Sequence, residues 1–414
     1  MIRKPLLILL ILFIITGFAM AQTYSIVIKG GHVIDPKNNI DAVMDIAIKD
    51  GKIALLAKNI DEKEGKQVIN AKDMYVTPGI IDIHVHVYYG TKNDQALING
   101  MTSVAPDAFS FRAGVTTFVD AGSSGWRTFP DFKRQTIDKS QTRVLAFLNI
   151  VGDGMSGGPF EQNIKDMNAH RTAKFAKTYP NEIVGIKLAH YSGHEWAPTD
   201  SAAEAGRLAD LPVMVDFGGS TPPLSMEELL MKHLRPGDIF THVYAYFPES
   251  REAPVDENGK VKPFIFEARK RGIIFDTGHG GGSFRWSQAI PSVQQGFIAD
   301  AISSDLHTGS MNGGMKDMSN LMSKFLCMGL TVQDVILRST WNPAKIIKRP
   351  ELGNLSVGTE ADVAVFSIMK GNFGFLDING EKKSGTQKMV AELTIRAGKI
   401  VWDLNGIAAP DVKK

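Results

Sequence analysis

The strongest constraint on the fold is a repeated pattern between residues 76 and 345. Eight short runs rich in β-branched residues recur there at intervals of roughly 27 to 40 residues, which is the spacing of βα units. The runs cover residues 81–87, 115–121, 143–150, 183–189, 212–217, 239–243, 273–277 and 301–306. Helical patterns fill the intervals, and two of them open with capping boxes at Ser225 and Thr331. Eight such units predict a closed α/β architecture, the (β/α)8 TIM barrel, which typically needs ~250 residues.

An open, doubly wound α/β sheet is the structural alternative. Sheets of that kind often carry a glycine-rich phosphate-binding turn after a strand. No such fingerprint follows any of the eight runs, so the closed barrel is the preferred fold.

The two ends of the chain differ from the middle. Residues 24–29 and 45–49 read as strands, and each is followed by a glycine turn signal. Near the other end, residues 362–366 and 394–402 read as strands separated by a loop. This arrangement predicts a small β-sandwich domain assembled from residues 22–75 and 346–414, with the barrel of residues 76–345 inserted between them.

The first 21 residues read as a signal peptide. Arg3 and Lys4 precede an apolar run, and Ala19-Met20-Ala21 provides the small-x-small pattern of a cleavage site. The mature chain would then begin at Gln22 and would be periplasmic or secreted. A membrane anchor is the alternative, but the apolar run is shorter than the ~20 residues that span a bilayer.

Charge and cysteine content restrict the possible partners. Lys and Arg number 46 and Asp and Glu number 44, and removal of the signal segment takes away two basic residues and no acidic one. A balanced mature chain does not indicate a nucleic-acid or anionic-membrane partner. The single cysteine, Cys327, excludes an internal disulfide and a lipid-modified cysteine at the cleavage site. We therefore expect a small-molecule substrate and no stable membrane anchor, and a homo-oligomer is left open.

Polar residues that could bind a metal lie on five of the predicted strands. In such barrels the active site lies at the carboxyl ends of the strands. The first strand ends in His84-Val85-His86, and side chains two apart on a strand point to the same side. The other four positions, on strands four, five, six and eight, are Lys187, Asp216, His242 and Asp305.

Each of these residues taken singly has an ordinary structural explanation. A lone His-x-His is more often structural than metal-binding, a buried lysine can pair with an aspartate, and an aspartate near a strand end often caps a helix. Charged groups inside a barrel are costly unless they are paired or bound to a metal. Because five strands carry such groups to the same end, the joint pattern indicates a metal site.

With these residues in place, the chain resembles the amidohydrolase superfamily of metal-dependent hydrolases, in particular its deacetylase and D-aminoacylase-like branch. The resemblance covers nearly all of the mature chain and includes the split β-domain. The matching segments are residues 78–86, 114–117, 120–123, 185–187, 241–242, 276–280, 305, 342–344, 353–358 and 361–362. The first and last of these are specific, whereas the short ones are weak by themselves.

The resemblance implies one or two divalent cations per chain, usually zinc. His84 and His86 would hold one cation and His242 the other, and Lys187, carboxylated by CO2, would bridge them. A buried lysine has a lowered pKa, so its neutral amine can form a carbamate. Asp305 would bind a metal and act as the catalytic proton shuttle.

One position departs from the pattern of the family. The family usually has a histidine at the end of the fifth strand, where this chain has Asp216. A carboxylate oxygen also binds zinc, so Asp216 is a candidate ligand. The alternative is that the second metal is weakly bound or absent.

The reaction implied is hydrolysis of an amide, or an ester, of a small acylated substrate such as an N-acyl amino acid. A metal-bound hydroxide would attack and Asp305 would transfer the proton, which makes the protein a hydrolase of carbon–nitrogen bonds other than peptide bonds. A dihydroorotase- or hydantoinase-like cyclic amidohydrolase and a non-hydrolytic barrel enzyme such as a decarboxylase are the alternatives. Substrate-binding candidates that follow the strands, each of which could equally be an ordinary loop residue, are His190, Tyr191, His279 and Arg285.

Overall fold

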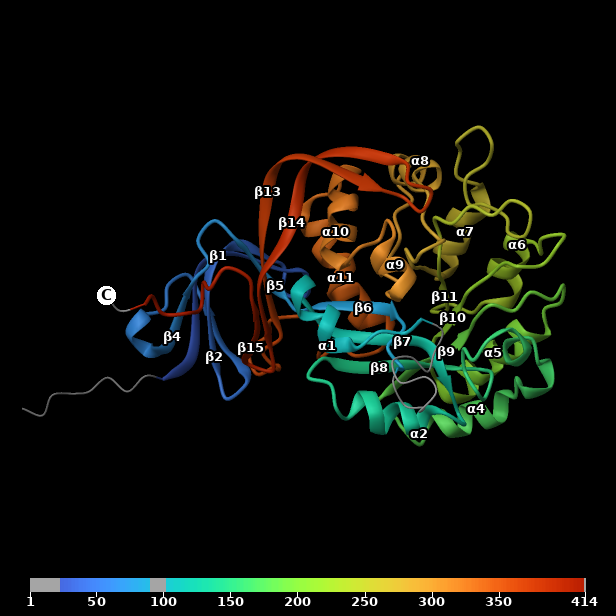
Figure 1. The fold of residues 1–414 in the computed structure, drawn as a ribbon, viewed down its shortest axis with the longest axis horizontal. Coiled ribbons are helices and arrows are strands. Elements are labelled where there is room, and N and C mark those ends of the chain that lie inside the picture. The colour runs from blue at the N-terminus through green and yellow to red at the C-terminus, as the bar shows by residue number, and fades with distance from the viewer. Residues whose placement is uncertain (1–22, 90–101, 413–414) are drawn as a thin grey trace, which may run out of the picture.

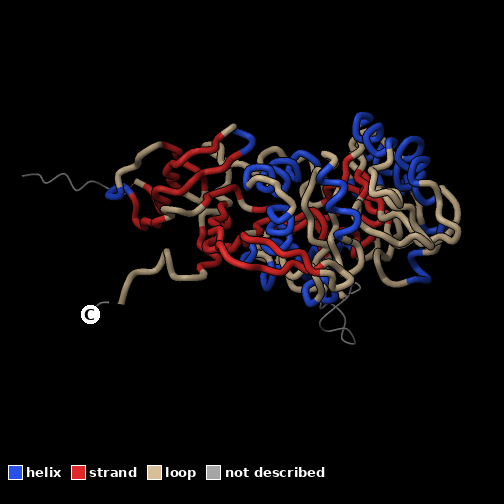
Figure 2. Tube along the Cα trace, turned by 90° about the horizontal axis from the view of Figure 1, so that it is seen from above, coloured by secondary structure: helices blue, strands red, loops and turns tan. Residues whose placement is uncertain are grey.

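The computed structural model describes residues 23–89 and 102–412. These residues form a strand-rich part and a larger part in which helices surround a set of strands, side by side along the longest axis (Figure 1). Figure 2 shows the same division from above, with strands gathered at one end of the molecule. The predicted signal segment lies outside the described residues. None of the helices in the described ranges is both long enough and apolar enough to cross a bilayer.

The larger part is the predicted barrel. Seven parallel strands pair in the order β12-β11-β10-β9-β8-β7-β6. Residues 301–306 occupy the eighth position, since parallel bridges join Ala301 to Asp276 beyond β12 and Leu306 to Val85 of β6. The strands are β6 (Ile80–Val85), β7 (Val115–Gly125), β8 (Arg143–Asn149), β9 (Ile183–Leu188), β10 (Val213–Val215), β11 (Ile239–Phe240) and β12 (Ile274–Phe275). The predicted (β/α)8 fold is confirmed.

The barrel strands are buried on both faces, as continuous apolar runs of parallel strands usually are. In β8, alternate residues belong to two different apolar clusters: Val144, Ala146 and Leu148 to one, and Leu145 and Phe147 to the other. This alternation follows from the period of two along a strand. In β8 the polar residues are the two at its ends, Arg143 and Asn149.

Helices follow the strands and cover the barrel. They are α1 (Pro106–Phe109), α2 (Phe129–Phe132), α3 (Gly158–Glu161), α4 (Ala169–Ala176), α5 (Ala197–Ala209), α6 (Met226–Glu228), α7 (Pro263–Arg271), α8 (Trp286–Gln294), α9 (Thr308–Asn312), α10 (Met318–Cys327), α11 (Val332–Ser339) and α12 (Trp341–Ile346). The predicted capping box of α11 is present, because the side chains of Thr331 and Asp334 bond to each other's backbone amides.

Strands from both ends of the chain form the second part. They pair in one mixed sheet in the order β15-β14-β13-β5-β1-β2-β3, and β4 pairs with β1. The strands are β1 (Tyr24–Asp35), β2 (Ile40–Lys49), β3 (Lys52–Ala57), β4 (Gly65–Asn70), β5 (Tyr75–Pro78), β13 (Val363–Leu376), β14 (Lys382–Arg396) and β15 (Lys399–Asp403). One apolar cluster joins residues of β1 to β5 with residues of β13 and β14, so the sheet closes around its own core.

The segment predicted as a loop between residues 366 and 394 is instead a long hairpin. β13 and β14 remain paired as far as Leu376 and Lys382, and the turn between them contains Asn379-Gly380, with Gly380 at a φ of 82°. The two strands arch from the β-sheet across α10 towards α8 (Figure 1). There the indole Nε1 of Trp286 donates to the carbonyl oxygen of Glu381 at 3.1 Å. The hairpin therefore ties the two parts together.

Candidate active site

The two histidines of the first barrel strand face one carboxylate. Nε2 of His84 lies 3.6 Å from Oδ1 of Asp305, and Nε2 of His86 lies 3.0 Å from the same oxygen. Both side chains are buried, and β6 ends at Val85 between them. The alternation along the strand thus brings the two rings to one side, as the sequence predicts.

Lys187 lies beside His84, near the end of β9. Its Nζ is 3.4 Å from Nε2 of His84, and the residue is almost completely buried. In the part of the chain that the structure describes, no carboxylate lies within 4.0 Å of this amine, although a buried cation normally has one. Burial lowers the pKa of Lys187 below its usual value, which favours the neutral amine. A negative group attached to Nζ would supply the negative charge that the surroundings of Lys187 lack.

His242 and Asp305 are held in an unusual backbone conformation. Their φ angles are 58° and 49°, and positive values are uncommon for non-glycine residues and frequent at functional sites. Ligand atoms of His84, His242 and Asp305 all lie within 4.8 Å of one another. Gly280 packs against this group, because a Cβ at that position would lie 2.2 Å from Oδ2 of Asp305.

Asp216 follows β10 and faces two histidines. Its Oδ2 lies 3.6 Å from Nε2 of His242 and 3.6 Å from Nε2 of His190. Burial disfavours the ionised carboxylate, but His242, His190 and Lys187 hold the pKa of Asp216 well below its usual range. Asp216 is therefore an anion between imidazoles, which suits it to bind a cation.

Buried hydrogen bonds orient the first-strand histidines. Nδ1 of His84 lies 2.9 Å from Oγ1 of Thr241, and this hydroxyl donates to Oδ2 of Asp276 at 2.7 Å. Nδ1 of His86 lies 3.0 Å from Oγ of Ser123. Because each Nδ1 is engaged, each Nε2 is free to face the centre of the site. Such supporting bonds are typical of histidines that bind metals.

Comparison with known proteins agrees with this geometry. No family model matches the chain. A deacetylase of Brucella anthropi is 32% identical over 349 residues, which is 82% of this chain and 83% of the relative. A deacetylase of Agrobacterium fabrum is 31% identical over 339 residues, which is 80% of each chain. The chain belongs to the amidohydrolase superfamily.

Solved structures agree with membership of the amidohydrolase superfamily. An adenine deaminase superimposes with a TM-score of 0.81 at 27% identity, over 92% of this chain and all 100% of that one. A dihydroorotase superimposes with a TM-score of 0.79 at 27% identity, over 91% of this chain and 99% of the other. The predicted family is confirmed. The protein is a metal-dependent amidohydrolase that acts on carbon–nitrogen bonds other than peptide bonds, and the cluster at His84, His242 and Asp305 is the candidate site for its divalent metal.

The four substrate-binding candidates lie in different places around this amidohydrolase site. His190 lies beside Asp216, as described above. The hydroxyl of Tyr191 donates to Glu195 at 2.7 Å, and both residues line a small hollow that also contains Asp216. Arg285 immediately precedes α8, and among the described residues no hydrogen bond or ion pair joins its side chain to the histidine cluster.

His279 follows β12 and is enclosed by its neighbours. It is completely buried and stacks on Phe284, with ring centroids 4.6 Å apart. Its Nδ1 donates to the carbonyl of Gly280 at 2.9 Å, and its Nε2 accepts from Nζ of Lys324 at 2.6 Å. Lys324 also donates to the carbonyl of Leu376 at the hairpin tip, at 2.5 Å. These contacts give His279 a supporting position, and contact between His279 and the substrate stays a prediction.

Sequence reasoning missed the residues that orient the ligands. Thr241 precedes His242, Asp276 begins a matching segment, and Ser123 ends another, so each lay inside a motif without a stated role. Glu161 had no such signal, because it lies on the short helix α3 and reaches His190 from a different βα unit.

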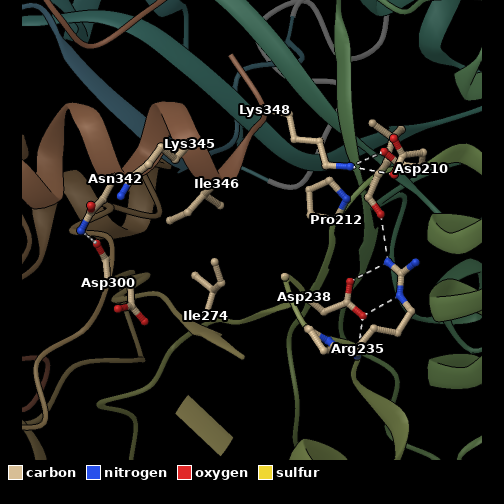
Figure 3. A pocket seen from close by; sticks show the side chains of 13 residues that line it. Asp210, Pro212, Arg235, Asp238, Ile274, Asp300, Asn342, Lys345, Ile346 and Lys348 are labelled. Carbon is tan, nitrogen blue, oxygen red and sulfur yellow. Dashed lines mark hydrogen bonds and ion pairs between the residues drawn. The ribbon is translucent and has the colours of Figure 1, made fainter. Parts of the chain in front are cut away.

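A cavity of about 370 Å³ lies away from these residues, at the opposite end of the barrel (Figure 3). Its walls include residues that immediately precede β10 and β11, and they contain two ion pairs, Lys348 with Asp210 and Arg235 with Asp238. This end of a barrel usually serves stability.

Proposed function

We propose that the protein uses zinc to hydrolyse an amide, or an ester, of a small acylated compound such as an N-acyl amino acid. The observation that carries the proposal is the convergence of His84, His242 and Asp305 within 4.8 Å, beside the buried amine of Lys187. The deacetylases among the relatives support an acyl group as the part that is removed.

The residues of the site fit the metal. We assign His84 and His86 to one cation, and Asp216 and His242 to a second. Lys187 would stand between them as a carbamate, formed when its neutral amine adds to CO2 through a new N–C bond and releases one proton. Imidazole and carboxylate are ligands that zinc takes, and the carbamate supplies the negative group that the surroundings of Lys187 lack.

Asp305 is suited to move the proton. Bound divalent cations lower the pKa of water and polarise a carbonyl group. Burial disfavours the ionised form of Asp305, but His86 and His242 lower the pKa of its carboxyl, so it is available as a base. Asp305 would accept the proton of the attacking water and then pass it to the leaving nitrogen. The products of an amide are then a carboxylic acid and an amine.

A cyclic amide is the second candidate substrate. The dihydroorotase with 27% identity over 91% of this chain supports it. The same residues would open the ring, so that one product forms where an acyclic amide gives two.

A screen of the zinc-loaded protein tests the proposal. N-acyl amino acids, acyl esters and cyclic ureides would be incubated with it, and the products identified by mass spectrometry. We expect release of a carboxylic acid and an amine from the first class, at a rate ~10²- to 10⁴-fold lower with Asp305→Asn. Ring-opened products would favour the cyclic alternative, and release of CO2 would contradict hydrolysis.

We also propose that the protein is exported and cleaved near Ala21. The support is the basic pair Arg3-Lys4, the apolar run and Ala19-Met20-Ala21. Intact-mass measurement of the protein recovered outside the cytoplasm tests this. A chain that keeps residues 1–21 and stays in the membrane fraction contradicts it.

A further inference from the structure

His190 is held in place from two directions. Its Nδ1 lies 2.7 Å from Oε2 of Glu161, and its carbonyl accepts a hydrogen bond from the side-chain amide of Gln162 at 2.6 Å. The backbone has a φ of 52°, which is unfavourable for a histidine unless its surroundings impose it. The contacts therefore fix both the backbone and the ring of a residue that lies in a loop after β9.

The bond to Glu161 determines which nitrogen of His190 is free. A carboxylate oxygen accepts, so Nδ1 carries a proton and Nε2 is the nitrogen left to face Asp216. The same holds for His242, whose Nδ1 lies 2.6 Å from the carbonyl of Gly278, and for His84 with its donor bond to Thr241. All three histidines thus bond through Nδ1 and turn Nε2 towards an acidic partner of the site, which is how ligating histidines are arranged.

Asp216 lies beside both His190 and His242, at distances that can be compared with those around a zinc ion. Nε2 of His190 and Nε2 of His242 each lie 3.6 Å from Oδ2 of Asp216. Two ligand atoms ~2.1 Å from a tetrahedral zinc are ~3.4 Å apart. Each nitrogen is thus close to the separation from Oδ2 that a shared zinc requires. Among the described residues these three do not form a group whose ligand atoms all lie within 4.8 Å, so the loop that carries His190 would have to move towards His242 for one ion to bind all three.

We propose that His190 is a ligand of the second divalent cation, together with Asp216 and His242, and that Glu161 positions it. The inference rests on the proposed metal site but does not depend on the substrate. In this arrangement the loop after β9 supplies an imidazole to the ion held at the end of β10.

A simple ion pair between His190 and Glu161 explains less. The side chain of His190 is 38% exposed, and that of Glu161 is 3% exposed. Exposed ion pairs contribute little to stability, whereas burying a carboxylate is costly. The burial of the Glu161 carboxylate is explained if the imidazole of His190, which it orients, binds a metal. Because His190 and Asp216 are more exposed than His84 and Lys187, the second ion should exchange more readily than the first.

Metal counting tests the proposal without reference to activity. His190→Ala and Glu161→Ala would be compared with the wild type and with His194→Ala. His194 is a matched control, because it lies on the same loop with its Nδ1 3.0 Å from the carbonyl of Pro222. Each protein would be dialysed against a weak chelator, and zinc per chain measured by native mass spectrometry.

We expect His190→Ala to lose one ion per chain and to keep the other, and His194→Ala to keep both. Glu161→Ala should weaken binding of the labile ion ~10- to 100-fold, as removal of a group behind a ligating histidine typically does. A wild type with only one tightly bound ion contradicts the proposal, as does a His190→Ala protein with the wild-type number and chelator resistance of both ions.

Anomalous diffraction at the zinc edge provides a measurement that does not depend on a variant folding. We expect an ion ~2.0–2.1 Å from Nε2 of His190 in the wild type. An ion bound to Asp216 and His242 but out of reach of His190 overturns the proposal. Failure of the substrate screen would contradict the proposed function and leave these metal counts unchanged, so the two failures are distinguishable.

Discussion

Replacing Thr241 by valine tests how much the hydroxyl of Thr241 contributes to metal binding through His84. Its hydroxyl connects Nδ1 of His84, at 2.9 Å, to Oδ2 of Asp276, at 2.7 Å, and all three side chains are buried. Valine has nearly the same shape as threonine, so Thr241→Val removes the two hydrogen bonds and leaves the packing largely intact. Nε2 of His84 would no longer be oriented by a strong partner at Nδ1.

The size of the effect follows from the bonds lost. Two hydrogen bonds contribute ~0.5–1.5 kcal/mol each, and ~1.4 kcal/mol corresponds to a tenfold change in affinity. Nδ1 of His84 is also 3.5 Å from Oδ2 of Asp276, so the ring keeps a weaker partner in the variant. We therefore expect metal affinity to fall about tenfold, the lower end of the ~10- to 100-fold typical for such supports.

Competition with a chromogenic chelator measures this affinity directly. Thr241→Ser keeps the hydroxyl and serves as the control, so its affinity should stay close to that of the wild type. Thermal unfolding of the metal-free proteins would check that valine does not disturb the fold. If Thr241→Val bound zinc as tightly as the wild type, the hydroxyl would not orient His84 and the argument would be wrong.

Three further predictions follow from the same region. Asp305→Asn should keep the fold and much of the metal but lower kcat ~10²- to 10⁴-fold, because an amide cannot accept the proton; an unchanged kcat on the best substrate would rule out the shuttle role. Lys187→Ala should lose metal and activity, with partial rescue by short carboxylic acids, and an occupied site beside an unmodified Lys187 in a crystal structure would contradict the carbamate. Burial lowers the pKa of Lys324 to about 7 from a usual 10.5, so the unfolded chain binds more protons between these values and the wild type should gain stability as pH rises through this range. Lys324→Met should remove that gain in urea unfolding at pH 7 and pH 9, and equal gains in both proteins would refute it.

The sequence was sufficient to predict the barrel because its strands are buried on both faces. The run of residues 144–148 is apolar throughout, and the spacing of the strands leaves room for one helix each. The ligand positions were predictable for a related reason. Polar residues such as Lys187 and His242 stand out at the ends of otherwise apolar strands, where burial makes them costly without a partner.

The long hairpin escaped prediction because its strands are half exposed over a polar stretch. Residues 367–374 and 382–390 alternate poorly and include several glycines and lysines, so the pattern resembles a loop. The Asn379-Gly380 turn was the available signal. Contacts between residues of different βα units could not be predicted from the sequence either. Nothing in the spacing of Glu161 and His190 shows that they meet, because the meeting depends on how the loops after β8 and β9 fold together.

The hairpin of β13 and β14 is synthesised after the barrel, and this affects when the surroundings of the active site are completed. Leu376 and Glu381, which contact Lys324 and Trp286 beside the site, leave the ribosome after every barrel strand has been made. A nascent chain in which every barrel strand has been made therefore still lacks the hairpin residues that support the loop of His279. The supports of that loop are therefore complete only after the hairpin of β13 and β14 has been made, and a truncation that removes β14 would act on the active site as well as on the sheet.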